Sequence, residues 1–363
     1  MRKISVEMIE PGMVLAKSVF GDTGQTLLRA DVEIKAQYID YMRRVGVEYV
    51  YIRDSRIEDI NVEDPVSEET RHEARQLVKN IVNELQSMDP EDLKTKSLNI
   101  NDRDIFDTVN KIIDELLLNK DVVVQLVDFR TKDDYLFAHS INSTILATLV
   151  AIKMRYKYKE LKWLALGTMF HDVGMALLPA EIMNKTGALT AEEYQIVTEH
   201  PQQGYDIFKK FDIFDARSGA VILQHHERFQ GQGYPRGIKG DKIYPLAQIA
   251  AIADVYDALT SDRPHRKAFQ PHQAIEMLMS WGEELFEINI LRSFLSIVAA
   301  YPVGSHVMLS NGDSGLVVAN NPGFTLWPVV RLLYVGEEMA PHPAPYDLDL
   351  SKTHYLTIVR VIE

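Results

Sequence analysis

The stretch WLALGTMFHD, residues 163–172, ends an apolar run with two adjacent polar side chains. Residues 163–170 have the composition of a buried helix, and His171 and Asp172 follow where that helix approaches a glycine, Gly174. Burying a carboxylate beside an imidazole costs free energy unless a cation or hydrogen bonds compensate for the lost water. We therefore expect a helical core in which this pair meets a metal ion.

Histidines recur on both sides of this stretch. Of eleven histidines, five lie between residues 139 and 226, each within a helical pattern or at its end: His139, His171, His200, His225 and His226. A lone histidine is more often a hydrogen-bonded core or surface residue than a metal ligand. Nitrogen and oxygen ligands on several helices, however, are how helical bundles build internal sites for two metals. The clustering therefore favours metal ligation.

Asp254 adds a second carboxylate of the same kind. It lies at the edge of an apolar helical face in residues 245–260, where it requires a positive partner. The chain contains no cysteine, so any metal must be bound by nitrogen and oxygen atoms. Such a donor set favours iron or manganese, with zinc or nickel as alternatives.

The chemistry that fits this site is hydrolysis at phosphorus. Two metals about 3.5–4 Å apart lower the pKa of a bridging water and stabilise charge on phosphoryl oxygens. A carboxylate such as Asp172 suits a bridging position, while neutral imidazoles suit terminal ones.

Three motifs and three further stretches follow one another in the order of a known family. The motifs are HD (171–172), HHER (225–228) and GQGYP (231–235), and the stretches are HSIN (139–142), ADVYDALT (253–260) and SDRPHRKA (261–268). Over residues 126–298, close to half of the chain, the sequence resembles the HD-GYP branch of the HD phosphohydrolases. These are all-helical, metal-dependent phosphodiesterases that cleave the bacterial second messenger cyclic di-GMP to the linear dinucleotide pGpG and often onward to GMP.

The resemblance implies a set of metal ligands and a substrate-recognition loop. The implied ligands are His139, His171, Asp172, His200, His225, His226 and Asp254, of which His171 and Asp172 are also implied as catalytic. The loop is implied to contact substrate through Gly233, Tyr234 and Pro235. Glycines permit positive φ and close backbone approach, and a tyrosine offers a ring or a hydroxyl. The simpler alternative for the loop is a plain turn.

Charge is distributed unevenly along the chain. The formal net charge is −13, which opposes binding to a nucleic-acid polymer. The segment between His226 and Lys267, however, contains seven Lys or Arg and five Asp or Glu, so its local charge is compatible with a small anionic substrate. We expect Arg263, Arg266 and Lys267 to contact phosphate or guanine, and a solvated charged loop is the alternative.

The sequence departs from the family pattern at three positions. Met175 stands where the family usually has a lysine that can neutralise phosphate, so we expect slow catalysis by the native protein. Tyr135 stands where some members have a glutamate that supports a third metal, so we expect two metals. Gln230 replaces the usual Asp or Asn before Gly231, a milder change.

The rest of the chain predicts smaller modules around a mainly α core. We expect an α+β module over residues 1–55, a linker and helical connector over 56–125, the all-helical HD-type domain over 126–299, and a β-rich module over 300–363. Within the core, Thr190 and Glu193 predict a capping box that starts a helix running to His200, with a boundary at Pro201.

Location and partners follow from the same patterns. The first residues lack the continuous apolar core of a signal peptide, and no apolar stretch approaches the roughly 18 residues of a membrane helix, so we expect a cytoplasmic protein without membrane insertion. The connector helices could form a homodimer or simply pack on the surface. The leading hypothesis is a cyclic di-GMP phosphodiesterase. Two alternatives are a catalytically weak cyclic di-GMP receptor that signals to a protein partner and a general HD nucleotide phosphohydrolase.

Overall fold

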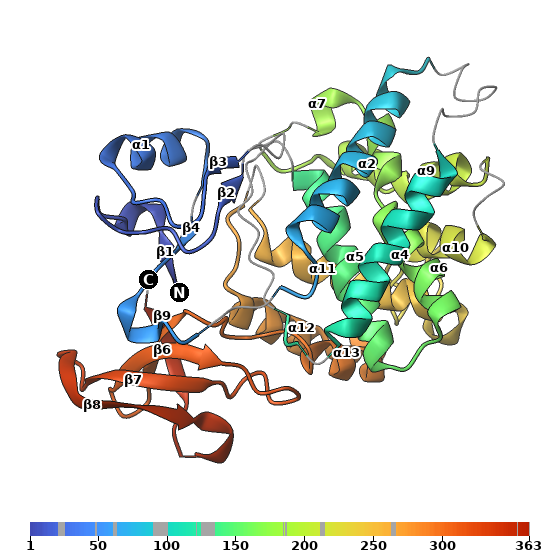
Figure 1. Ribbon diagram of the computed structural model, residues 1–363. Coiled ribbons are helices and arrows are strands. Elements are labelled where there is room, and N and C mark those ends of the chain that lie inside the picture. Colours follow the sequence, from blue (N-terminus) through green and yellow to red (C-terminus); the bar gives the residue numbers. More distant parts are fainter. Residues whose placement is uncertain are drawn as a thin grey trace. The chain divides into compact units, whose positions relative to one another are not determined.

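A computed structural model of the chain (Figure 1) describes residues 1–20, 26–47, 49–60, 64–89, 101–120, 122–124, 135–183, 185, 187–210, 215–262, 266–353 and 355–362. The chain divides into two compact units, and each is built from separate stretches of sequence. The mixed unit contains Met1–Asp64, Asp121–Asp134 and Leu295–Glu363. The helical unit contains Pro65–Lys120 and Tyr135–Phe294.

The helical unit confirms the expected all-helical core. Its helices are α2 Glu68–Ser87, α4 Asp102–Leu118, α5 Tyr135–Lys153, α6 Tyr158–Met169, α7 Ala180–Met183, α8 Ala191–Val197, α9 His200–Phe208, α10 Ala216–Gln224, α11 Pro245–Thr260, α12 Pro271–Leu285 and α13 Ile288–Leu295, with the 3-10 helices η4 Val173–Leu177 and η5 Gly240–Lys242. Helix α5 packs against α6, α11, α2 and α4. The two helices expected as a connector, α2 and α4, therefore help to bury α5.

Helix α5 is the most apolar long helix of this unit. Its window Leu136–Lys153 has a mean hydropathy of 1.3, so by length and composition it could cross a membrane, and 78% of that window is buried inside the protein. Burial against neighbouring helices is what the central helix of a bundle requires. The hydropathy of α5 is thus accounted for by packing.

The N-terminal part of the mixed unit is a small α+β module, as expected. It contains β1 Arg2–Ser5, β2 Val19–Phe20, β3 Thr26–Leu28, α1 Ala36–Arg44 and β4 Tyr49–Ile52, with the 3-10 helices η1 Val6–Met8 and η2 Ser55–Ile57. Strands β1 and β4 pair antiparallel, as do β2 and β3. Buried aliphatic side chains such as Leu15, Ile34 and Val50 form its core.

The C-terminal part is a five-stranded antiparallel sheet, which confirms the expected β-rich module. The strands are β5 His306–Leu309, β6 Ser314–Ala319, β7 Val329–Val335, β8 Ala340–Asp349 and β9 Ile358–Ile362, in the order β8-β7-β6-β5-β9, with the 3-10 helix η6 Leu350–Lys352 after β8. The sequence did not predict β8, because Pro341, Pro343 and Pro345 interrupt it. Proline is tolerated there because β8 is an edge strand that needs hydrogen bonds on one side only.

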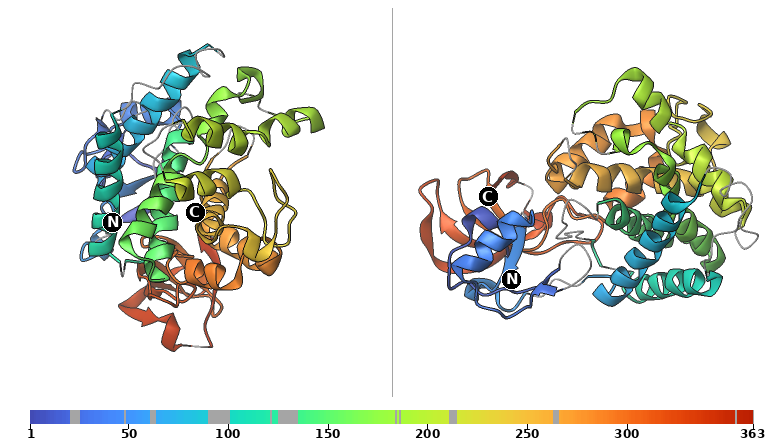
Figure 2. Two further views of the ribbon diagram at one scale, coloured as in Figure 1. Left: turned by 90° about the vertical axis from the view of Figure 1, so that its right-hand side faces the viewer. Right: turned by 90° about the horizontal axis from the view of Figure 1, so that it is seen from above.

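Contacts between residues far apart in sequence join the two parts of the mixed unit, which are coloured blue and red in Figure 2. Ile57 packs with Leu316, Val318 and Leu333 of the sheet. Arg331 on β7 pairs with Asp59 at 2.7 Å.

One helix boundary in the core differs from the sequence prediction. The capping box at Thr190 and Glu193 is present, but the helix it starts ends at Val197, and His200 is the first residue of the next helix, α9. Pro201 therefore lies in the first turn of α9 rather than marking an end. Proline is favourable there because a first-turn residue needs no N–H donor for the helix.

Close packing of η4 on α9 requires a glycine. A Cβ built on Gly174 would lie 2.1 Å from the carbonyl oxygen of His200 and 2.7 Å from the amide nitrogen of Gly204. Both contacts are with main chain, which cannot swing aside as a side chain can. Gly174 therefore allows the segment after Asp172 to approach the start of α9.

We predict that Gly174→Ala destabilises the protein by about 1–3 kcal/mol or more, because the added methyl group must push η4 away from α9. Chemical denaturation followed by circular dichroism measures this effect. Gly187→Ala is the matched control, since its Cβ would meet nothing within 4 Å among the described residues. Equal denaturation midpoints for the two variants would show that the close approach has no energetic consequence.

Candidate metal centre

All seven expected ligands come together in the helical unit. His139 lies on α5, and Asp254 lies on α11. His171 and Asp172 follow α6, His200 starts α9, and His225 and His226 follow the last residue of α10. They form two groups, one of Asp172, His200, His225 and His226 and one of His139, His171 and Asp254. Within each group the potential ligand atoms lie within 4.8 Å of one another.

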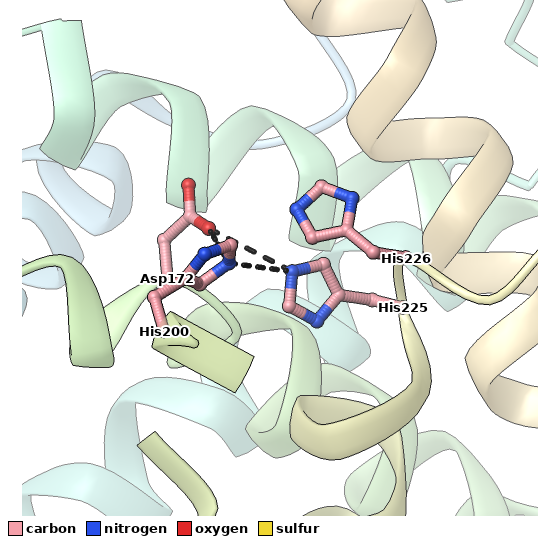
Figure 3. Close-up of side chains that lie close together, drawn as sticks. All are labelled: Asp172, His200, His225 and His226. Carbon is pink, nitrogen blue, oxygen red and sulfur yellow. Dashed lines mark hydrogen bonds and ion pairs between the residues drawn. The ribbon is translucent and has the colours of Figure 1, made fainter. Parts of the chain in front are cut away.

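Asp172 faces both groups, one carboxylate oxygen toward each. Its Oδ1 lies 3.2 Å from His200 Nε2 and 3.7 Å from His225 Nε2. Dashed lines in Figure 3 mark these contacts among Asp172, His200 and His225. Its Oδ2 lies 3.5 Å from His171 Nε2 and 3.8 Å from His139 Nε2. The carboxylate thus has the orientation that a bridge between two cations needs.

Asp254 lies on the other side of His139. Its Oδ1 is 3.1 Å from His139 Nε2 and 3.9 Å from His171 Nε2, while its Oδ2 is 3.7 Å from His226 Nδ1. Two carboxylates and five imidazoles therefore share one buried region.

Main-chain carbonyls orient three of the imidazoles. The Nδ1 atoms of His171, His200 and His225 each donate to the carbonyl oxygen three residues earlier, at 2.7 Å in every case. A neutral imidazole that is protonated at Nδ1 offers only a lone pair at Nε2. In this neutral form, the Nε2 lone pairs of the three imidazoles face the carboxylate of Asp172.

A cation fits this arrangement and a hydrogen-bond network does not. His200 Nε2 lies 3.3 Å from His225 Nε2, although both atoms carry lone pairs. The Nε2 atom of His171 is buried and has no hydrogen-bond partner among the described residues. Acceptors that converge without donors require positive charge, so the residues present fit divalent metal ions.

The electrostatics of the site favour metal-binding protonation states of Asp172, Asp254 and His225. Burial raises the pKa of Asp172, but the positive charge and Nε2–H donors that His171, His200 and His225 offer when protonated outweigh this effect and hold the pKa well below its usual range. The carboxylate therefore requires positive charge beside it, from protons on these imidazoles or from metal ions in their place. The pKa of Asp254 is likewise lowered despite burial, mainly by its contact with His139. Burial lowers the pKa of His225 to about 4, so its imidazole is neutral at pH 7.

The GYP loop packs directly on this site. A Cβ on Gly233 would lie 2.3 Å from the carbonyl oxygen of His226, so only glycine allows the loop to come this close. The buried carboxylate of Glu227 accepts hydrogen bonds from the amides of Arg236 and Ile238, at 2.9 and 3.0 Å, and so holds the far side of the loop. These contacts fix the loop against the site, while its contact with substrate stays a prediction.

Tyr234 lies over the histidines. Its ring centroid is 4.5 Å from that of His226 and 6.3 Å from that of His200. Burial, with a further contribution from Asp254, raises the pKa of its hydroxyl, which therefore stays protonated and can donate a hydrogen bond. Pro235 follows through a cis peptide bond.

The other expected substrate contacts are less well placed or lie outside the described residues. The guanidinium of Arg266 donates to the carbonyl oxygens of Ala258 and Leu259 at the end of α11, at 2.5 and 3.2 Å, which gives it a structural role. Lys267 is exposed and its contact with substrate stays a prediction. Arg263 lies outside the described residues.

Two positions that depart from the family pattern lie on elements that also hold, or directly follow, expected ligands. Met175 lies in η4, three residues after Asp172, and its side chain is half-buried. Tyr135 is the first residue of α5.

Sequence reasoning missed functional candidates around the site. Asp257, one turn after Asp254 on α11, accepts a hydrogen bond of 2.7 Å from His139 Nδ1, and its spacing on the helix could have revealed it. Tyr194 on α8 makes an edge-to-face contact with Tyr234, with ring centroids 6.4 Å apart, yet 53% of it is exposed. No pattern in the sequence singles out Tyr194.

Known proteins match this chain in two places. Residues 131–287 match the HD domain family, and residues 306–363 match the KOW domain associated with HD domain. The cyclic di-GMP phosphodiesterase PA4108 of Pseudomonas aeruginosa is 33% identical over 237 residues, which cover 65% of this chain and 57% of the relative. The cyclic di-GMP phosphodiesterase response regulator RpfG of Xanthomonas campestris is 28% identical over 56% of this chain and 54% of its own length.

A third relative has a different substrate in its name. The 3'3'-cGAMP-specific phosphodiesterase 3 of Vibrio cholerae is 31% identical over 40% of this chain and 32% of the relative. The chain spans between about a third and three fifths of the length of these three relatives.

The helical core and its histidine–aspartate centre therefore have the features of an HD domain, in agreement with the match of residues 131–287 to that family. The GYP motif and the names of the relatives from Pseudomonas aeruginosa and Xanthomonas campestris agree, more narrowly, with the resemblance to the HD-GYP proteins.

We predict about two transition-metal ions per chain, because Asp172 presents one oxygen to each ligand group. Protein purified without oxygen or chelator, then subjected to elemental analysis, tests this number. A chain that takes up fewer than one ion under these conditions would rule out a centre built for two.

Proposed function

We propose that this protein is a metal-dependent phosphodiesterase that hydrolyses cyclic di-GMP to pGpG, and onward to GMP in part. The observation that carries the proposal is the division of the Asp172 carboxylate between two groups of inward-facing ligands, with Tyr234 of the GYP loop lying over the same centre. The names of the relatives from Pseudomonas aeruginosa and Xanthomonas campestris support the choice of substrate.

The seven proposed ligands would form two metal-binding groups. The group around His200 and the group around His139 would each hold one divalent ion, and Asp172 would belong to both. When bound, two such ions activate water for in-line attack on phosphorus and stabilise the charge on the phosphoryl oxygens. His171 is oriented by the carbonyl of Thr168, so its Nε2 stays directed at Asp172 without rearrangement.

The GYP loop supplies the substrate side of the site. Gly233 brings the main chain against His226, which places the Tyr234 ring next to the metal ligands. The protonated hydroxyl of Tyr234 can donate to a phosphate oxygen, and its ring offers a face for a nucleobase. Pro235 restricts the loop beyond Tyr234. Lys267 and Arg263 remain the proposed cationic contacts.

Finer features of the activity follow from the donor set and the buried core. Nitrogen and oxygen ligands favour iron or manganese, with zinc or nickel as alternatives. Burial of α5 inside the helical unit agrees with a cytoplasmic enzyme that is not inserted in a membrane.

The proposal also includes two kinds of protein contact: association of two copies of the chain as a homodimer, and binding of a protein signalling partner.

Met175 favours a second candidate function. It replaces the usual lysine with an uncharged thioether in η4, three residues after Asp172. A centre without that cation would bind cyclic di-GMP but cleave it slowly, as a receptor does. Turnover separates the two functions, because a receptor binds the dinucleotide without product formation.

We predict that the metallated protein converts cyclic di-GMP to linear product and that Asp172→Ala abolishes this turnover while leaving the helical content largely unchanged. Asp172 serves both ligand groups, whereas the fold depends on apolar packing. Product-resolved chromatography and circular dichroism measure the two effects. Asp206→Ala, on the exposed face of α9, is the control.

The same assay should include 3'3'-cGAMP and ordinary nucleotides, which test the choice of substrate. Preference for cGAMP or for mononucleotides would contradict the substrate proposed here. Wild-type turnover in Asp172→Ala would show that this carboxylate does not bridge the metals.

We predict that Met175→Lys raises kcat, because a cation beside the phosphate stabilises the transition state more than the ground state. The gain could reach ~10²-fold by comparison with other single electrostatic contacts. Met183→Lys, on the nearby α7, adds the same charge elsewhere and controls for its general effect. If well-folded, fully metallated Met175→Lys is no faster than the native enzyme, position 175 does not serve the phosphate.

A further inference from the structure

A chain of buried hydrogen bonds runs from α2 to the metal centre. Arg71 Nη1 on α2 donates to Asn142 Oδ1 at 3.0 Å, and Asn142 Nδ2 donates to Asp257 Oδ1, also at 3.0 Å. Asp257 Oδ2 accepts from His139 Nδ1 at 2.7 Å. All four side chains are at most 2% exposed. The chain thus ends on a ligand of the centre.

His139 needs such a chain because of its position within a helix. His171, His200 and His225 bind main-chain carbonyls near helix ends. His139 lies within α5, where the carbonyls are engaged in helical hydrogen bonds. A side chain from another helix, Asp257 on α11, takes the place of the carbonyl.

Arg71 determines which way the Asn142 amide faces. A guanidinium has donors only, so Asn142 must turn its oxygen toward Arg71 and its NH2 group toward Asp257. The reversed amide would set its oxygen against a carboxylate oxygen, which is unfavourable in a buried site. Arg71 also brings a positive charge near the buried Asp257, whose second carboxylate oxygen accepts from Ser261 Oγ at 3.3 Å.

We propose that Arg71 is a positioning residue of the metal centre, acting through Asn142 and Asp257 to fix the His139 ring with its Nε2 lone pair directed inward. Such outer partners orient metal-binding imidazoles and raise their basicity. Arg71 lies outside residues 131–287, so the centre depends on a helix that the HD domain match does not include. The inference rests on the proposed metal centre but on no particular substrate.

A purely structural role for Arg71 is the alternative, because its Nε also donates to the carbonyl oxygen of Val66, at 3.4 Å. In that role Arg71 would tie α2 to its neighbours and affect stability alone. Metal affinity separates the roles, since only a positioning residue changes the affinity of one ion and spares the other.

The test compares Arg71→Met and Asn142→Leu with the native full-length chain. Chelator-treated proteins are titrated with Mn2+ and bound ions are counted by electron paramagnetic resonance, while thermal unfolding of the metal-free proteins reports stability. Ser143→Ala is the matched control, because Ser143 is buried on α5 and its hydroxyl has no hydrogen-bond partner among the described residues.

We expect both variants to bind one Mn2+ about 10–100-fold more weakly than the native protein and the other ion unchanged. Arg71→Lys should recover part of the loss, because it restores a charged donor, and it replaces Arg71→Met if that variant does not fold. Native-like affinity for both ions in every folded variant, with lower stability alone, would overturn the inference and leave the metal centre intact. A native protein that binds no Mn2+ would overturn both.

Discussion

The structure depends on carboxylate oxygens and imidazole Nε2 atoms that converge in the helical core and, when the rings are neutral, face one another without a donor among the described residues. The two oxygens of Asp172 meet imidazole Nε2 atoms at 3.2–3.8 Å on both sides, and the Nε2 atoms of His200 and His225 face each other at 3.3 Å. Nδ1 protons are engaged with carbonyls, so they cannot relieve this repulsion. Burying so many lone pairs is unfavourable without positive charge, and the same lone pairs become ligands when divalent ions enter.

The surrounding helices serve to hold these acceptors at fixed positions. Gly174 lets η4 approach α9, which sets Asp172 beside His200. Gly233 and Glu227 hold the GYP loop against the end of α10, so that Tyr234 covers the histidines. Helix–helix contacts thus determine the geometry of the centre, while the mixed unit contains none of its seven ligands.

The candidate metal ligands were easier to recognise in the sequence than the residues and elements that surround them. Ligands such as His171 and Asp172 were recognisable because polar residues at the end of an apolar helix need a partner, and the all-helical core and β-rich end were confirmed. Strand β8 was not predicted because its prolines are typical of turns and loops rather than of strands.

Arg71 was not predicted as a functional residue because it lies in the apolar stripe of α2, together with Ala74 and Val78, where only the folded structure shows its partner. Arg266 belongs to the SDRPHRKA stretch and was therefore expected to contact substrate. In the structure its guanidinium donates to carbonyl oxygens at the end of α11, a contact that no sequence pattern predicts.

The central claim is that Asp172 joins two metal ions. Anomalous diffraction from crystals of manganese-loaded protein tests it most directly, because it locates each ion independently of the ligands. The account predicts two peaks about 3.5–4 Å apart, one nearest Asp172 Oδ1 beside His200 and one nearest Oδ2 beside His171. A single peak, or two peaks that do not share Asp172, would contradict it.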